Sequence, residues 1–212
     1  MTVDETLDKV FTFVGISIPH QGDIRVYLRV LRNQDEKTYE HSVRVGILAS
    51  EIATWVNEFG VSARILLWAG LLHDIGKSYV PAELLNKKEK FSDADRLAVE
   101  PHAMYGWEML HGIHDYTAHI IVRHHQYGVH PYPAVLPPLP DHGFPIEIIN
   151  RAARILALAD FYDALMNRNN DKNGSVQLSL QEKKTLFIEN NKDQKELIEA
   201  LEGILFFRME ER

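Results

Sequence analysis

The sequence predicts an all-α fold, a single helical domain with a two-metal site between its central helices. Hydrophobic residues recur at steps of three and four along most segments, which is the spacing of one face of an α-helix. No segment alternates apolar and polar residues over more than a few positions, as a half-buried β-strand would. Histidine and aspartate residues stand beside strongly apolar stretches, where burying an unpaired charge costs several kcal/mol. A bound cation is the simplest partner that they could share.

The composition narrows the class of protein. The 212 residues fit one domain, and an apolar fraction of 45% allows a sizeable core. No run of about 18 apolar residues could span a membrane, and the acidic N-terminus lacks the pattern of a signal peptide. The absence of cysteine excludes disulfides, thiolate ligands and a thiol nucleophile, and the net charge of −7 argues against a nucleic-acid surface. We therefore expect a cytoplasmic protein with a small-molecule partner, without DNA or membrane binding.

The first helices are expected before residue 60. Residues 1–37 form a helical extension, with the clearest periodicity over residues 22–33. The next helix is expected over residues 38–59, and its apolar face includes His41. This histidine should therefore point toward the core.

A central helix is predicted over residues 62–73. Ser62 can cap its start, and the segment is apolar on nearly all sides, which is typical of a buried helix. Gly76 fits the end of this helix. Pro81 then opens a further short helix.

Two more helix boundaries are marked, one by a capping pair and one by a proline. Ser92 with Asp95 resembles a capping box at a helix start. Pro101 interrupts that helix, and His102 stands at the start of the next one. A further helix is expected over residues 115–126.

A long irregular loop is predicted over residues 127–145. It holds six of the nine prolines, which rules out a regular helix, and a loop of this length is often functional. A long helix over residues 146–167 follows and carries Asp160. Residues 169–174 form a polar break.

The last segment, residues 169–212, is expected to form two helices that pack on the metal-binding domain of residues 38–168. The starts of these helices resemble capping boxes: Ser179 with Glu182, and Asp193 with Glu196. The last helix has an apolar stripe that is either core or the contact of a homodimer: Leu197, Leu201, Ile204 and Leu205.

Seven residues are candidate metal ligands: His41, His73, Asp74, His102, His124, His125 and Asp160. Imidazole and carboxylate ligands without sulfur suit iron, manganese, zinc, nickel or cobalt. Seven ligands exceed the need of one ion, whereas two ions that share Asp74 as a bridge would use them all. Adjacent histidines on a helix point about 100° apart. His124 and His125 therefore bind two neighbouring ions, or one is a ligand and the other a substrate contact.

We therefore expect two divalent ions as cofactors, with iron, manganese, nickel, zinc and magnesium as the candidates. Two such ions about 3.5–4 Å apart hold a bridging hydroxide and clamp a phosphoryl group. Lys77, three residues after Asp74, can reach the same phosphate as a point charge. The predicted activity is hydrolysis of a phosphoester, with Asp74 and Lys77 as catalytic residues. Tyr132 and Arg154 are further candidates for substrate contact, although Arg154 also suits a structural salt bridge, and Asp163 is expected to support the fold or a ligand.

The order of these residues resembles the HD superfamily of metal-dependent phosphohydrolases, and most closely its HD-GYP branch. The matching stretches lie within residues 38–168: YEHSVRVGILASEIA, LLHDIGKSYVPAELLNKKEKFSDAD, PHAMYGWEML, VRHHQYG and RILALADFYDAL. The resemblance implies a helical domain that binds two or three ions, commonly iron or manganese, and hydrolyses cyclic di-GMP. It also implies the distribution of the ligands. One ion would be held by His41, His73, Asp74 and Asp160, the second by Asp74, His102, His124 and His125, and Lys77 would touch the phosphate.

The chain departs from the branch beside this ligand set. After the histidine pair, the branch has an acidic residue and a Gly-x-Gly-Tyr-Pro run, whereas here Pro131 precedes Tyr132 and Pro133. A proline-rich insertion follows, and residues 167–173 lack the usual basic-aromatic motif. In the family these two parts contact the dinucleotide. The expected substrate is therefore a nucleotide, with cyclic di-GMP as one candidate among several.

Two other functions fit the same ligand set. Some relatives of the superfamily use it on a di-iron centre to cleave C–C or C–P bonds with O₂. A non-catalytic signalling protein could instead hold structural metals and bind a nucleotide or a partner through the altered loop. Iron content with O₂ consumption, and turnover of nucleotides, distinguish these alternatives from the hydrolase.

Overall fold

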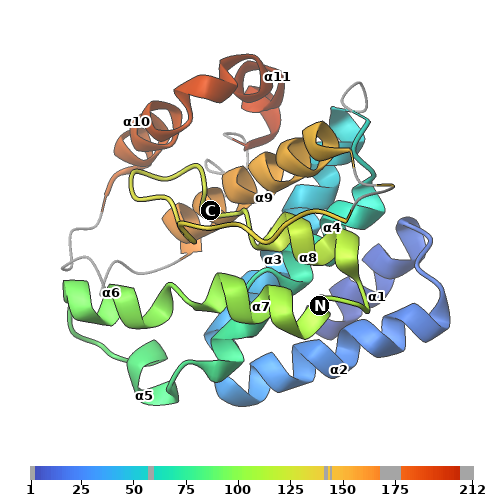
Figure 1. Cartoon of the computed structure of the whole chain (residues 1–212). Helices are drawn as coiled ribbons and strands as arrows, with labels where there is room; N and C mark the ends of the chain where they lie inside the picture. The colour runs from blue at the N-terminus through green and yellow to red at the C-terminus, as the bar shows by residue number, and fades with distance from the viewer. Residues whose placement is uncertain (1–2, 57–59, 141–142, 144, 168–177, 206–212) are drawn as a thin grey trace.

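The computed structural model describes residues 3–56, 60–140, 143, 145–167 and 178–205 (Figure 1). Every regular element among these residues is a helix, which confirms the all-α prediction. The α-helices are α1 Val3–Phe13, α2 Ile18–Gln34, α3 Glu36–Trp55, α4 Ala63–Leu72, α5 Ala82–Leu85, α6 Asp93–Val99, α7 His102–Leu110, α8 Asp115–Ile121, α9 Ile146–Asn167, α10 Leu180–Asn190 and α11 Lys195–Leu205. Two 3₁₀ helices, η2 Ile75–Tyr79 and η4 Lys192–Gln194, complete the set. None of the described helices is long and apolar enough to cross a bilayer.

Helix α4 is at the centre of the molecule, as its apolar sequence predicted. It packs against α3, α8 and α9, and residues 66–72 are all buried. The axes of α3 and α4 approach closely at two glycines, because a Cβ on Gly70 would lie 2.4 Å from the Cα of Gly46. This contact fixes the helix that carries His41 against the helix that ends at His73.

The boundaries differ from the prediction where local contacts replace regular helix. The N-terminal extension contains α1, which Tyr39 ties to α3 by donating a hydrogen bond of 2.9 Å to Asp4. Helix α8 ends at Ile121 rather than near 126, because the following residues form turns in which Arg123 N–H donates to the Ile120 carbonyl. The described part of the loop 127–145 is irregular, as expected. The polar break at 169–174 lies outside the described residues.

The predicted capping boxes have different outcomes. Ser92 with Asp95 and Ser179 with Glu182 form capping boxes at α6 and α10. The prediction for Asp193 was wrong. Its carboxylate instead accepts hydrogen bonds from Arg154 on α9, at 2.7 and 2.8 Å, and the short helix η4 precedes α11.

The C-terminal helices lie at the top of the view in Figure 1, beyond α9. Phe187 of α10 is buried against α9, with its ring 5.8 Å from that of Tyr162. The ion pair between Arg154 and Asp193 adds a second attachment. In the apolar stripe of the last helix, Leu197 and Leu201 are buried, as expected for core residues. The side chains of Ile204 and Leu205 lie outside the described part of the chain.

Gly76 does not end α4, as the sequence suggested, but lies within η2 against α7. A Cβ at this position would lie 2.0 Å from the carbonyl oxygen of His102 and 2.5 Å from the backbone nitrogen of Gly106. Only a residue without a side chain allows the two backbones to meet. The contact sets His102 beside the neighbouring pair His73 and Asp74.

We expect Gly76→Ala to destabilise the protein by about 1–3 kcal/mol, because overpacking forces the backbone of η2 away from α7. Urea unfolding measures this change. Gly22→Ala is the matched control, since Gly22 lies in a helix with open space around its Cα. That variant should be neutral or slightly more stable, because alanine favours a helix by up to about 1 kcal/mol. Equal stability of the Gly76→Ala variant and the wild type would contradict the close-contact explanation.

Candidate metal centre

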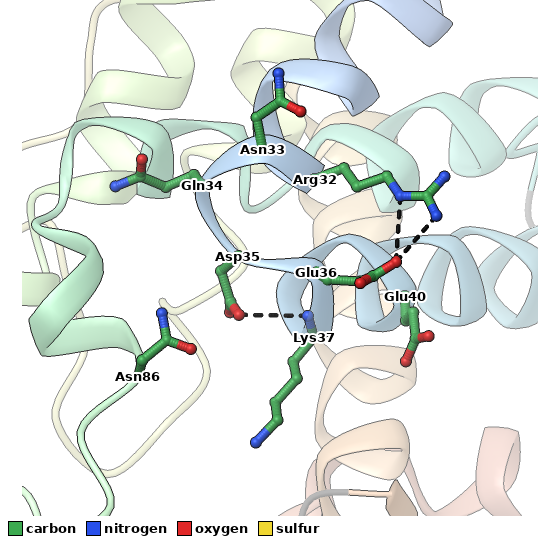
Figure 2. A pocket seen from close by; sticks show the side chains of 8 residues that line it. All are labelled: Arg32, Asn33, Gln34, Asp35, Glu36, Lys37, Glu40 and Asn86. Carbon is green, nitrogen blue, oxygen red and sulfur yellow. Dashed lines mark hydrogen bonds and ion pairs between the residues drawn. The ribbon is translucent and has the colours of Figure 1, made fainter.

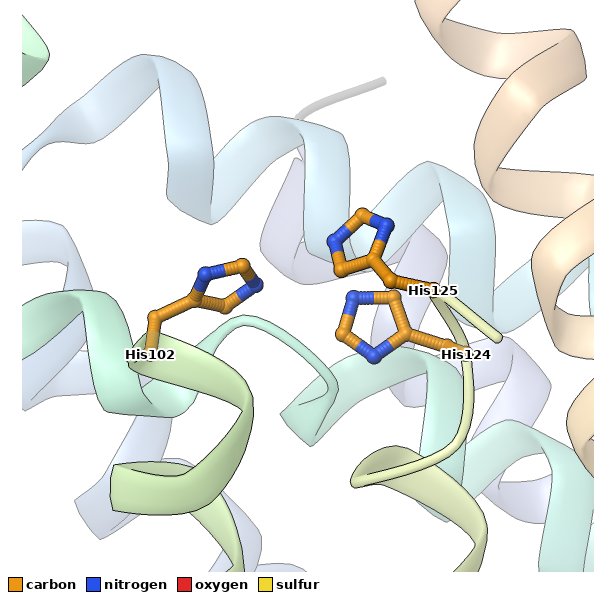
Figure 3. A group of neighbouring side chains, drawn as sticks. All are labelled: His102, His124 and His125. Atoms are coloured by element: carbon orange, nitrogen blue, oxygen red, sulfur yellow. The ribbon is translucent and has the colours of Figure 1, made fainter. Parts of the chain in front are cut away.

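The seven predicted ligands come together between the central helices. They are delivered by α3 (His41), the end of α4 (His73), the residue before η2 (Asp74), the first residue of α7 (His102), the turn after α8 (His124 and His125) and α9 (Asp160). Their ligand atoms form three overlapping groups, each with all atoms within 4.8 Å of one another. The groups are His41, His73 and Asp74; His73, His124 and Asp160; and His102, His124 and His125. Figure 3 shows the last group, with the ring of His102 directed toward the histidine pair.

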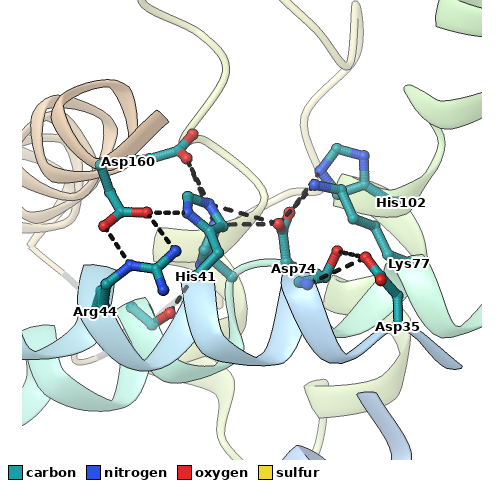
Figure 4. A network of polar contacts seen from close by, with 11 residues as sticks. Asp35, His41, Arg44, Asp74, Lys77, His102 and Asp160 are labelled. Carbon is teal, nitrogen blue, oxygen red and sulfur yellow. Dashed lines mark hydrogen bonds and ion pairs between the residues drawn. The ribbon is translucent and has the colours of Figure 1, made fainter. Parts of the chain in front are cut away.

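Asp74 occupies the position between the groups. Its Oδ2 lies 3.4 Å from Nε2 of His73, and its Oδ1 lies 3.4 Å from Nε2 of His102. The two oxygens of one carboxylate therefore face imidazoles on two sides of the cluster (Figure 4). Asp160 completes the His41 side, with its Oδ1 2.9 Å from Nε2 of His41. The arrangement suits a carboxylate shared between two cation positions.

Three of the histidines, His73, His102 and His124, keep the lone pair of Nε2 available for a metal ion. Nδ1 of His73 lies 2.8 Å from the carbonyl oxygen of Gly70, and Nδ1 of His102 lies 2.7 Å from that of Val99. His124 makes the same contact with Ile121. A carbonyl oxygen can only accept a hydrogen bond, so each Nδ1 carries the proton and each Nε2 keeps its lone pair. Among the described residues, Nε2 of these three histidines has no hydrogen-bond partner although it is buried. This is the usual arrangement of histidines that bind metals.

The charge state of the cluster also fits a cation. Burial lowers the pKa of His73 to about 4 and that of His102 to about 3, so both imidazoles are neutral at pH 7. For Asp74, burial acts to raise the pKa, but His73 and Lys77 outweigh it and hold the pKa well below its ordinary value. For Asp160, burial likewise acts to raise the pKa, but the hydrogen bond and charge interaction with His41 help to outweigh it, so this pKa also lies well below its ordinary value. The buried carboxylate of Asp74 and the partly exposed carboxylate of Asp160, placed among imidazoles, are stabilised most directly by divalent ions.

Two of the three predicted substrate contacts lie at this cluster. The ammonium of Lys77 is 2.6 Å from Oδ2 of Asp74. The ring of Tyr132 stacks on His125, with centroids 4.3 Å apart, and lies 6.0 Å from the ring of His102. Both residues are therefore placed where a bound phosphoester could touch them, and their contact with substrate stays a prediction.

Arg154 forms the structural salt bridge that the sequence offered as the alternative to a substrate contact. Its buried guanidinium donates to Asp193 and, at 2.9 Å, to Asn191. These partners belong to the C-terminal helices rather than to the ligand cluster.

A network beside His41 was only partly predicted. Asp163, the expected supporting residue, lies 2.7 Å from Nδ1 of His41. Arg44 donates to the same carboxylate and was missed by the sequence reasoning. Its position three residues after His41, on the same helix face, is the signal that could have found it.

A surface pocket of about 430 Å³ lies at the junction of α2 and α3 (Figure 2). Its walls carry both charges and contain none of the seven candidate ligands; they are formed by residues 32–37, Glu40 and Asn86. Asp35 caps α3 from this pocket by accepting from the backbone of Lys37 and Thr38. The pocket is therefore formed by the α2–α3 turn and is separate from the candidate metal centre.

Comparison with known proteins agrees with this centre. A family model described as the HD domain matches residues 38–165, a range that contains all seven candidate ligands. The chain is 32% identical over 168 residues to the cyclic di-GMP phosphodiesterase PA4108 of Pseudomonas aeruginosa, covering 76% of this chain and 38% of that protein. It is 30% identical over 144 residues to the cyclic di-GMP phosphodiesterase response regulator RpfG of Xanthomonas campestris, covering 66% and 36%. It is 28% identical over 142 residues to the 3'3'-cGAMP-specific phosphodiesterase 1 of Vibrio cholerae, covering 64% and 30%.

The chain thus spans 38% or less of the length of each of these three relatives. The matched part nevertheless extends over more than half of this chain and includes all seven candidate ligands. The chain therefore belongs to the HD domain family, and its resemblance to the HD-GYP branch is confirmed.

Proposed function

We propose that this chain hydrolyses a phosphodiester bond of a nucleotide with the help of two divalent ions, and that cyclic dinucleotides are its substrate class. The observation that carries the proposal is the buried cluster of imidazole Nε2 atoms around two carboxylates. The names of the relatives, which are phosphodiesterases for cyclic di-GMP or 3'3'-cGAMP, support the choice of substrate class.

The ligands divide into two sets that share Asp74. One ion would be held by His41, His73, Asp74 and Asp160. The other would be held by Asp74 together with the group of His102, His124 and His125. The division is supported by the position of Asp74, whose two oxygens each lie 3.4 Å from an imidazole on a different side.

When bound, a pair of divalent ions supplies a water that is activated at neutral pH and positive charge for the phosphoryl oxygens. The chain adds its own contributions. Lys77 holds an ammonium beside Asp74, where it can donate to a phosphoryl oxygen as negative charge builds up. Tyr132, which stacks on His125, forms part of the wall against which the substrate would lie.

The reaction is an in-line displacement at phosphorus. Water would be added across the phosphodiester: its oxygen forms the new P–O bond while one of its protons passes to solvent, and the P–O bond to the ribose oxygen breaks. The ribose oxygen then takes a proton from solvent water. Water is the expected donor because the cluster imidazoles His73 and His102 are held neutral by burial, with pKa values of about 4 and 3.

The test uses purified chain reconstituted with Mn²⁺, or with Fe²⁺ without oxygen. Cyclic di-GMP, 3'3'-cGAMP and bis(p-nitrophenyl) phosphate are offered as substrates, and products are followed by chromatography. We expect hydrolysis of a cyclic dinucleotide to the linear form, and no reaction in metal-free protein. A chain that holds two ions and cleaves no phosphodiester would contradict the proposal and favour the non-catalytic alternative. Consumption of O₂ by the iron form would favour the oxygenase.

A further inference from the structure

His41 is held differently from the other three histidines whose Nδ1 contacts are described above. His73, His102 and His124 each donate Nδ1–H to a carbonyl three residues earlier in the chain. The orientation of each of these rings is therefore set by a local backbone contact. His41 instead places Nδ1 2.7 Å from Oδ2 of Asp163, which is 122 residues away on α9. The orientation of this ring depends on a tertiary contact.

Asp163 is itself fixed by further donors. Arg44 donates from Nε to Oδ1 at 2.8 Å and from Nη2 to Oδ2 at 3.1 Å, a bidentate pair. Asn167 donates to Oδ1 at 2.7 Å. Asp163 is 3% exposed, so both oxygens are removed from solvent. The carboxylate cannot rotate without breaking at least one of these contacts.

The same two helices also deliver the neighbouring ligand. Arg44 and His41 lie one turn apart on α3, whereas Asp163 and Asp160 lie one turn apart on α9. Across this interface, Nε2 of His41 lies 2.9 Å from Oδ1 of Asp160 (Figure 4). Asp163 thus joins α9 to α3 through both Arg44 and His41, at the point where His41 and Asp160 meet.

We propose that Asp163 is a positioning residue that turns Nε2 of His41 toward the cation position of His73, Asp74 and Asp160, with Arg44 as its clamp. The proposal rests on the two-ion function above. It goes further because it states that the histidines of the two cation positions are oriented in different ways. The His41 position depends on the contact between α3 and α9, whereas His102 and His124, on the other side, are oriented by local carbonyls. A supporting carboxylate of this kind commonly changes metal affinity about 10- to 100-fold.

The variants are Asp163→Ala, Asp163→Asn and the control Asp193→Asn. Alanine removes the acceptor for His41 Nδ1. Asparagine keeps one acceptor oxygen but brings an N–H₂ group against Arg44. The Asp163→Asn variant should therefore recover part of the ion affinity that Asp163→Ala loses. Asp193 is the matched control because it also forms a bidentate pair with an arginine and contacts α9, yet none of its described contacts is with an imidazole.

Two measurements separate positioning from a general structural role. Titration of metal-free protein with Mn²⁺ gives the number and affinity of the ions. We expect Asp163→Ala to keep one tight ion and to weaken the other about 10- to 100-fold, with Asp163→Asn in between and Asp193→Asn like the wild type. The ¹⁵N NMR spectrum of the metal-free protein reports the imidazole tautomers. Only His41 should change in Asp163→Ala.

The outcomes distinguish this inference from the proposed function. A wild type that binds two ions and hydrolyses a phosphodiester, beside a fully folded Asp163→Ala variant with unchanged ion affinity and tautomers, would overturn only the positioning role. Equal weakening of both ions would also overturn it, because the asymmetry would be lost. A wild type that binds no ions would overturn the proposed function and the positioning role together.

Discussion

Replacement of Asp74 by asparagine is expected to remove both ions and reduce hydrolysis below about a thousandth of the wild-type rate. Asp74 is the carboxylate that faces both sides of the cluster, with separate oxygens 3.4 Å from Nε2 of His73 and of His102. An amide has the same shape but no charge, and only one of its two polar atoms can bind a cation. Loss of the ions removes several kcal/mol of charge stabilisation, and each 1.4 kcal/mol or so is a factor of ten in rate.

This prediction is tested, without an activity assay, by measuring the number of ions per chain and the melting temperature. Mn²⁺ should raise the melting temperature of the wild type, because an ion that binds only the folded state stabilises it. Addition of Mn²⁺ should leave the melting temperature of the Asp74→Asn variant unchanged. Asp193→Asn is again the matched control and should respond as the wild type does. If Asp74→Asn retained two ions per chain, the bridging assignment would be wrong.

The second large effect is expected for Lys77→Met, which should lower kcat by about 10²–10³-fold while both ions remain bound. Methionine has a similar length and no charge, so the variant removes the ammonium that lies 2.6 Å from Asp74. The lost interaction is one that strengthens as charge develops on the phosphoryl oxygens. A larger effect on kcat than on KM follows, because the contact contributes mainly in the transition state.

Steady-state kinetics with the best substrate from the assays, together with ion counting, checks this prediction. Lys77→Arg is the control that keeps the positive charge but changes its geometry, and it should recover part of the rate. If Lys77→Met hydrolysed substrate at the wild-type rate, Lys77 would have no role toward the phosphate. If it lost the ions, its role would be to hold Asp74 in place rather than to contact the phosphoryl group.

Local patterns made the helical fold predictable, and with it the gathering of the seven candidate ligands in one cluster. The apolar character of residues 62–73 indicated a central helix, and residues 66–72 of α4 are all buried. Ser92 and Ser179 marked helix starts, because each capping box forms between residues that are only three positions apart. The gathering of these side chains was predictable because carboxylates and imidazoles beside apolar segments need a shared partner when they are buried; their binding of metal stays a prediction.

Contacts between distant residues were not predictable in the same way. Asp193 looked like a helix cap, yet its carboxylate pairs with Arg154, 39 residues earlier in the chain. The clamp of Arg44 on Asp163 joins residues 119 apart. Gly76 carries no local sign that its missing side chain admits the backbone of α7. Tertiary packing decides each of these cases, and no pattern over a few residues contains that information.

Counting the ions in the wild-type chain tests the central claim most directly. The protein is stripped of metal, reconstituted with Mn²⁺, freed from unbound metal and analysed by mass spectrometry of the element. Two ions per chain are predicted, because Asp74 presents one oxygen to each of two imidazole groups. A folded wild-type chain that retained one ion or none would contradict the two-ion account.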